Sequence, residues 1–129
     1  MEIPLRAALI TWLAADPALA GTLNSVSEET PMRAALPWLA IAASASIDWS
    51  AKDRTGREVR IALELHCRGD RPDSAAALCA ALEQRVAMLP AAQAGFRVVT
   101  TSVLRTRAEQ RDGNIRAILI EYRFRVLAD

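Results

Sequence analysis

Two stretches of this sequence alternate between apolar and polar residues with a period of two, and they constrain the fold more than any other feature. In Gly56–Cys67 the apolar positions alternate with an arginine, a glutamate and the only histidine of the chain. In Ile115–Leu127 they alternate with a glutamate and two arginines. This pattern is typical of strands that turn one face to a core and the other to solvent. The chain therefore contains a sheet with one apolar side.

Two other segments have apolar residues at helical spacing and are expected to cover that side. The first predicted helix is Pro4–Ala15, since proline is tolerated in a first turn. The second is Ser74–Met88, which Pro90 ends, and its apolar residues form one stripe. Asp70 or Asp73 is expected to cap the second helix, because aspartate accepts hydrogen bonds from the free backbone N–H groups there.

The remaining segments complete the predicted order. They comprise a short helix ending near Leu23, a loop over Asn24–Pro37 with room for a short extended piece, a strand over Trp38–Ala43, an exposed arm over Ile47–Thr55, a strand over Phe96–Arg105 and a polar loop over Ala108–Asn114. The prediction is a single domain spanning residues 1–129. Its class is α+β and its order is α-β-β-α-β-β, with an antiparallel four-stranded sheet packed by two helices.

Charge is divided unevenly between the two parts of the chain. Residues 1–50 hold two basic and five acidic side chains, whereas residues 51–129 hold fourteen basic and ten acidic ones. Such opposed charges suit contacts between unlike surfaces of neighbouring copies, or contact with a polyanion. The apolar stretch Ala34–Ile47 is too short to span a bilayer, so no membrane partner is expected.

The reactive side chains of the sequence do not predict an enzyme. Cys67 and Cys79 are interpreted as reduced, buried thiols. His66 and Cys67 are neighbours in a strand and point to opposite faces, so they cannot form a catalytic dyad. Glu64 and Glu121 are expected to form cross-strand ion pairs with arginines. We expect neither a cofactor nor a metal site, because no phosphate loop, dinucleotide motif or metal-ligand spacing is present.

A small nucleic-acid-binding module is the alternative interpretation. The last predicted hairpin is rich in arginine, and a ribbon of arginines can follow a phosphate backbone. Base stacking would need exposed aromatic residues, yet Tyr122 and Phe124 fall on the predicted core face. A solvated, salt-bridged strand face and a set of arginines lining the lumen of a ring are the competing interpretations.

A series of weak motifs runs through nearly the whole chain. They are the helix around Leu5–Leu9 with Asp16-Pro17 after it, the segment Pro37–Ile41, the strand Glu58–His66, the helix Ala75–Leu89 and the closing segment Glu121–Arg125. In this order the chain resembles the tail-terminator or tail-completion proteins of long-tailed phages and gene transfer agents. It departs from that family at Cys67-Arg68, where the family usually has an aromatic residue after the histidine.

The resemblance implies a non-enzymatic virion protein of a phage or phage-like particle, made in the bacterial cytoplasm. It implies a homohexamer ring that caps the tail tube and takes part in head-tail joining. The implied partners are other copies of the chain, the tail tube protein and the head connector or adaptor protein, with DNA in the lumen as a further candidate. The residues expected to form the ring or lumen contacts are Arg54, Arg57, Arg107, Arg111 and Arg116.

Overall fold

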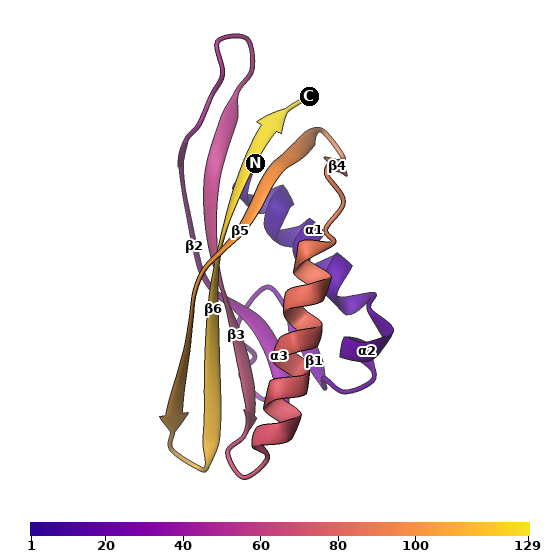
Figure 1. Ribbon diagram of the computed structural model, residues 1–129, viewed down its shortest axis with the longest axis vertical. Coiled ribbons are helices and arrows are strands. Elements are labelled where there is room, and N and C mark those ends of the chain that lie inside the picture. The colour runs from indigo at the N-terminus through magenta and orange to yellow at the C-terminus, as the bar shows by residue number, and fades with distance from the viewer.

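The computed structural model describes residues 1–129 and consists of a strongly twisted sheet with helices on one of its faces (Figure 1). The elements are α1 (Glu2–Ala14), α2 (Pro17–Ala20), β1 (Ser25–Ser27), β2 (Trp38–Asp48), β3 (Gly56–Arg68), α3 (Pro72–Ala87), β4 (Ala92–Gln93), β5 (Phe96–Arg111) and β6 (Ile115–Ala128). The sheet has the order β1-β2-β3-β6-β5-β4. Each neighbouring pair is antiparallel except β1 and β2, which are parallel.

The α+β class is confirmed, but the prediction of a four-stranded antiparallel sheet is wrong. The sheet has six strands, because β1 adds three residues along Trp38–Ala40 and β4 adds two residues beside the start of β5. The short helix predicted before Leu23 is present as α2, and Asp16 caps it by accepting a hydrogen bond from the Leu19 backbone N–H at 3.2 Å. Strands of two or three residues are too short to produce a detectable alternation.

The strands β2 and β5 are longer than their predicted counterparts. Most of the predicted loop Ala108–Asn114 is strand, since β5 pairs with β6 as far as Arg111↔Ile115. Only a tight turn remains, with positive φ angles at Gly113 and Asn114. The prediction failed because β5 contains irregularities at Val98/Thr100 and Val103/Arg105, which shift the side-chain alternation.

The helices α1 and α3 cover the apolar side of the sheet, as predicted (Figure 1). The core joins leucines of both helices to Leu63, Ile120, Tyr122 and Phe124 of the central strands, all of them buried. Neither Asp70 nor Asp73 caps α3: the N-cap residue is Arg71, without a side-chain hydrogen bond. The helix begins at Pro72, whose φ suits the first helical position, so Asp70 lies before the N-cap and Asp73 lies inside the first turn.

Trp12 and Arg85 connect the two long helices. The Trp12 indole N–H donates to the Arg85 carbonyl oxygen at 2.7 Å, and the Arg85 Nε–H donates to the Trp12 carbonyl oxygen at 2.9 Å. The guanidinium lies 3.3 Å from the centre of the indole ring, a favourable cation–π geometry. None of the helices has the length and apolar composition needed to cross a membrane.

The β2–β3 hairpin projects beyond the helices at one end of the long axis, and the β5–β6 turn lies at the opposite end (Figure 1). Gly56 is at the base of the first of these two arms. It accepts a hydrogen bond from the Trp49 backbone N–H at 3.0 Å and donates one to the Ser50 hydroxyl at 3.0 Å. A Cβ atom on Gly56 would press on the Trp49 carbonyl oxygen and lie 2.7 Å from Leu127 Cδ2. Gly56 therefore allows the backbone of Trp49 to pack closely against the start of β3.

Replacing Gly56 with alanine should displace the arm and destabilise the fold. The added methyl meets backbone, which cannot rotate away, so we expect the Gly56→Ala variant to lose about 1–3 kcal/mol in free energy of unfolding. Urea denaturation measures this loss. The exposed neighbour Thr55 provides the control, and Thr55→Ala should stay within about 0.5 kcal/mol of the wild type. Equal stability of both variants would contradict the close approach at Gly56.

Candidate functional site

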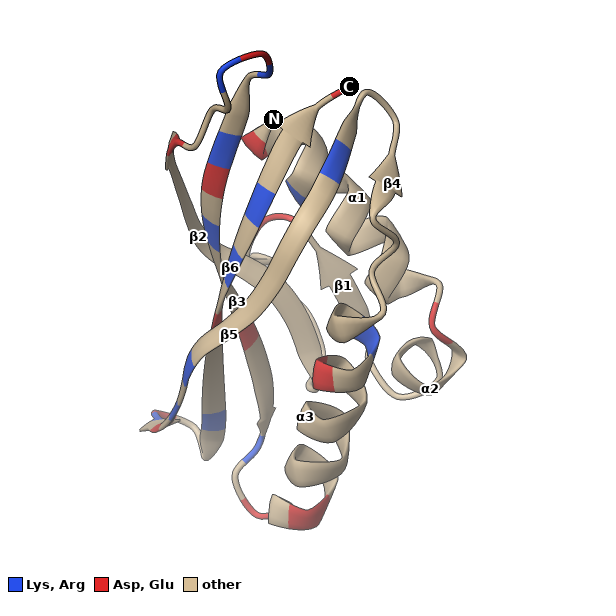
Figure 2. Cartoon of the chain, turned by 45° about the horizontal axis from the view of Figure 1, so that its top comes forward, with Lys and Arg blue, Asp and Glu red and all other residues tan.

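The face of the sheet opposite the helices carries most of the strand arginines. The pairing register places on this face Arg60 of β3, Arg123 and Arg125 of β6, and Arg97, Arg105, Arg107 and Arg111 of β5. We refer to these seven residues as the arginine face. Figure 2 shows basic residues distributed along the three strands, with acidic residues between them. Five of the seven were not predicted as interface residues: Arg60, Arg97, Arg105, Arg123 and Arg125. The sequence alternation indicated the side of Arg60, Arg123 and Arg125, whereas the irregularities of β5 concealed that of Arg97 and Arg105.

Glu58 is shared by three arginines of the arginine face. Its carboxylate accepts a hydrogen bond from Arg125 Nε at 3.1 Å and lies 4.0 Å from Arg123 Nε and 3.9 Å from Arg60. Glu58 is only 7% exposed, and a carboxylate this buried needs such partners. Arg125 also lies over the Trp49 ring at 5.5 Å, which connects this cluster to the base of the β2–β3 arm.

The outer part of the arginine face consists of ion pairs on β5 and β6. Arg105 donates to Glu121 at 3.1 Å, so the cross-strand ion pair predicted for Glu121 is confirmed. Glu109 lies between Arg107, at 2.8 Å, and Arg111, at 3.1 Å. These arginines are exposed, and ion pairs at exposed positions add little stability. Their side chains therefore remain free to exchange partners.

The prediction that Glu64 pairs with an arginine is wrong. Glu64 Oε1 lies 2.6 Å from His66 Nε2, and Thr30 donates to Glu64 Oε2 at 3.3 Å. The Trp38 ring stacks on His66 at 4.0 Å between centroids. His66 is on the predicted polar face but is buried, because the loop between β1 and β2 crosses this end of the face. The cluster holds that loop in place, and only the tertiary structure brings its members together.

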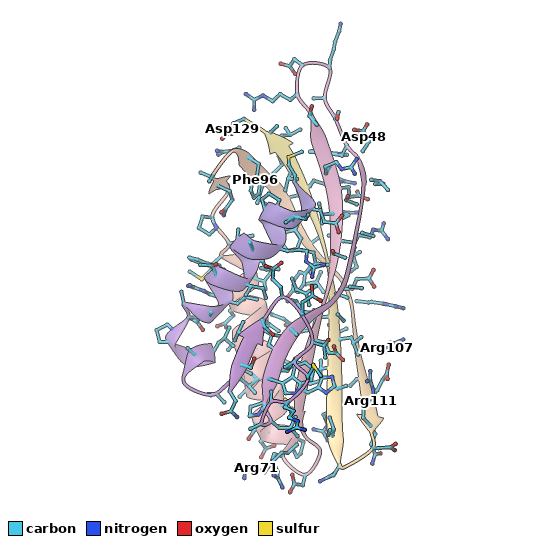
Figure 3. All side chains as sticks on the ribbon, turned by 180° about the vertical axis from the view of Figure 1, so that it is seen from behind. Asp48, Arg71, Phe96, Arg107, Arg111 and Asp129 are labelled. Atoms are coloured by element: carbon cyan, nitrogen blue, oxygen red, sulfur yellow. The ribbon has the colours of Figure 1, made fainter.

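The five arginines predicted as interface residues do not form one cluster. Arg54 is at the tip of the β2–β3 arm, and Arg57 donates to Ser46 at 3.2 Å. Arg116 donates to the Gly69 carbonyl oxygen at 3.2 Å. Arg107 and Arg111 lie together toward one end of the molecule, far from Asp48, where β2 enters the arm (Figure 3). Their role in an interface stays a prediction, and it would involve at least two separate surfaces.

An acidic cluster lies at the other edge of the sheet, between α1 and β2. Ser44 donates to Glu2 at 2.6 Å, and this hydrogen bond is the main reason why the pKa of Glu2 is below its usual value. Arg6 donates to Ser44 at 2.8 Å and lies 3.4 Å from both Glu28 and Glu29. Arg6 pairs with Glu28 and Glu29, and both Arg6 and Arg57 act on Glu2, so three carboxylates face two arginines and this edge has an excess of negative charge.

The two thiols are poor nucleophiles in this structure. Burial raises the pKa of Cys67 to about 11, with a further increase from Cys79 and a decrease from Arg116. Burial also raises the pKa of Cys79. Since the thiolate is the reactive form, both cysteines are structural rather than reactive. The structure contains no group of three or more histidine, cysteine, aspartate or glutamate side chains arranged to hold a metal ion.

Comparisons with known proteins give one family match and a match in fold. The family model described as "Tail completion protein gp17" matches residues 7–127. A chain in a solved structure entitled "Virion of native gene transfer agent (GTA) particle" has the same fold, with a TM-score of 0.80 and 23% sequence identity. The similarity covers 97% of this chain and 96% of that chain. No curated protein matches the sequence.

Removing the Glu64 carboxylate should destabilise the buried cluster. In a Glu64→Ala variant, the buried His66 loses its hydrogen-bond partner, so we expect a loss of about 1–3 kcal/mol in free energy of unfolding, measured by urea denaturation. The control is Glu121→Ala, which breaks a more exposed ion pair and should cost less than about 1 kcal/mol. If the Glu121 variant were the less stable of the two, the structural role of Glu64 would be wrong.

Cys67 should resist alkylation in the folded protein. At pH 8 it is almost entirely protonated, because that pH is far below its pKa of about 11, and only the thiolate reacts readily. We expect iodoacetamide to label Cys67 only after denaturation, with the modified residue identified by mass spectrometry. The partly exposed Cys79 is the internal comparison. Labelling of Cys67 in the native chain at the rate of a free thiol would contradict its burial.

Proposed function

This chain belongs to the tail-completion protein family, and from that premise we propose that it forms a ring at the end of a phage or phage-like tail tube. The ring is a cyclic assembly of six copies that stops growth of the tube and joins it to the head connector. The match of the family model to residues 7–127 carries this proposal. The protein would act as a structural part of the tail, in contact with the tail tube protein and the connector.

The shape of the subunit supports a head-to-tail ring. Its two arms, the β2–β3 hairpin and the β5–β6 hairpin, extend to opposite ends of the long axis (Figure 1). The two edges of the sheet also differ in charge, with the acidic α1–β2 edge on one side and exposed arginines of β5 on the other. Contacts between unlike surfaces close into rings when the rotation between copies permits it.

The state of the ionisable groups supports a non-enzymatic role. His66 and Glu64 are hydrogen-bonded to each other beneath a loop, and both cysteines have raised pKa values. An acid–base or nucleophilic catalyst needs a group with a pKa suited to its task that can reach a substrate. The charged groups of this chain instead hold strands and loops together, as expected of an assembly component.

The ion pairs of the arginine face also favour assembly over nucleic-acid binding. Arg60, Arg123 and Arg125 share Glu58, and the arginines of β5 share Glu109 and Glu121. Phosphate binding would compete with these carboxylates. Arg54, which forms no ion pair at the tip of its arm, is the better candidate for contact with DNA passing through a ring.

Deleting the gene in the host that produces the particles tests the proposed function. Without a terminator the tube has no stop signal and no surface for the connector, so we expect headless tails of variable length in electron micrographs. Supplying the wild-type chain in trans should restore tails of uniform length with heads attached. The control strain carries the same deletion and an empty vector. Normal headed particles in that strain would refute the proposal.

A further inference from the structure

Two strands of the sheet have long edges without a neighbour. β1 pairs with β2 only over Trp38–Ala40, so the remainder of β2 is open on that side. β4 pairs with β5 only at Phe96 and Arg97, so the remainder of β5 is open as well. The regular, uninterrupted parts of these edges are Ala43–Asp48 and Arg105–Arg111. Unpaired backbone N–H and C=O groups at such edges readily accept an added strand.

The β2 edge lacks the usual protection against such pairing. Its sequence from Ala43 to Asp48 contains no proline and no lysine, and four of its six residues are alanine or serine. Natural edge strands are commonly shielded by lysine, proline or short length. Small side chains also let a second backbone approach closely. The β2 edge is therefore suited to receive another strand.

The charges of the two edges are complementary. The β5 edge carries Arg105, Arg107 and Arg111 against Glu109. The β2 edge ends in Asp48 and lies beside the acidic cluster of Glu2, Glu28 and Glu29. Two β5 edges would bring arginines together, and two β2 edges would bring carboxylates together. Like charges placed opposite each other are destabilising, so each edge fits the other edge better than it fits itself.

Exposed apolar side chains lie next to both edges. On the acidic side these are Ile47 of β2, 62% exposed, and Ile3 of α1, 78% exposed. On the basic side Val103 and Leu104 of β5 are 52% and 37% exposed. The outward surface of α1 also includes Pro4, Ala7 and Ala14, and a helix this apolar on its outer side is usually covered. Both edges thus have apolar surface that a contact would bury.

We propose that the β5 segment Arg105–Arg111 of one copy pairs as an added strand with the β2 segment Ala43–Asp48 of the next copy. The sheet then continues from subunit to subunit, and the arginines of β5 face the acidic cluster of the neighbour. Strand addition of this kind derives its affinity from main-chain hydrogen bonds. The inference rests on the proposed ring and identifies the contact that closes it. Because the joined edges lie toward opposite ends of the subunit (Figure 3), the contact is head-to-tail.

Cross-linking tests this contact. In a Cys79→Ala background, Ala45→Cys marks the β2 edge and Arg107→Cys marks the β5 edge; both residues are exposed and lie on the sheet face opposite the helices. With a short thiol-to-thiol cross-linker we expect neither single variant to link to itself. A mixture of the two should give dimers only. A chain carrying both substitutions should give a ladder of multimers that ends at the closed ring. Efficient self-linking of either single variant would overturn the head-to-tail contact.

A charged residue on the β2 edge provides the second test. Ala45→Lys should abolish the ring mass measured by light scattering, because an edge lysine blocks strand addition. The matched control is Ala80→Lys on the outward side of α3, another exposed alanine, which should assemble as the wild type does. Circular dichroism should show both variants folded. Normal rings formed by the Ala45→Lys variant would overturn the inference.

These results are independent of the test of the proposed function. Rings that form without a β2–β5 cross-link overturn the inference and leave the ring intact. A chain that restores headed tails and self-associates but gives no ladder also overturns the inference alone. Conversely, a complete ladder from a chain that is dispensable for particle assembly supports the contact and overturns the proposed function.

Discussion

The antiparallel pairing of β3 and β6 is the interaction on which the rest of the structure depends. It runs from Gly56↔Leu127 to Arg68↔Ile115 and joins the two strands at the centre of the sheet. Because side chains alternate along both strands, this one register places their fully buried apolar residues, such as Leu63, Ile120 and Phe124, on one face. α1 and α3 cover that face. A shift of one residue in either strand would turn its arginines toward the helices.

The same register decides the electrostatics of the opposite face. Glu58 and Arg125 are directly paired across β3 and β6, and Arg60 is paired with Arg123. Two arginines opposite each other would repel, but the buried Glu58 carboxylate lies within reach of both. The arginines of this face outnumber its carboxylates, so the face stays basic, but most of these arginines lie beside a carboxylate of the same subunit. A surface of this kind favours a specific protein contact over non-specific attraction to a polyanion.

Helical coverage ends before the sheet does, and this has consequences for function. The strands β2 and β3 continue past the helices into the β2–β3 arm (Figure 1). Ile47 lies at the start of this arm, where there is little core to join, and Val103 and Leu104 lie at an irregularity of β5; all three are exposed. In an isolated subunit such long strand edges and apolar side chains promote aggregation. Their presence is understandable if neighbouring proteins cover them in an assembled tail.

Periodicity in the sequence was sufficient to locate β3, β6, α1 and α3 and to assign Tyr122 and Phe124 to the core, because these elements repeat a strong apolar pattern against one core. The pattern did not reveal β1 or β4, since their pairing depends on where a neighbouring strand lies. It also gave no sign of the cluster of Glu64, His66, Trp38 and Thr30. Only the folding of the β1–β2 loop over the sheet brings these residues together. Local sequence thus determined which residues face inward. The tertiary structure decided which side chains meet and which strand edges stay open, because such contacts join residues that are distant in the chain.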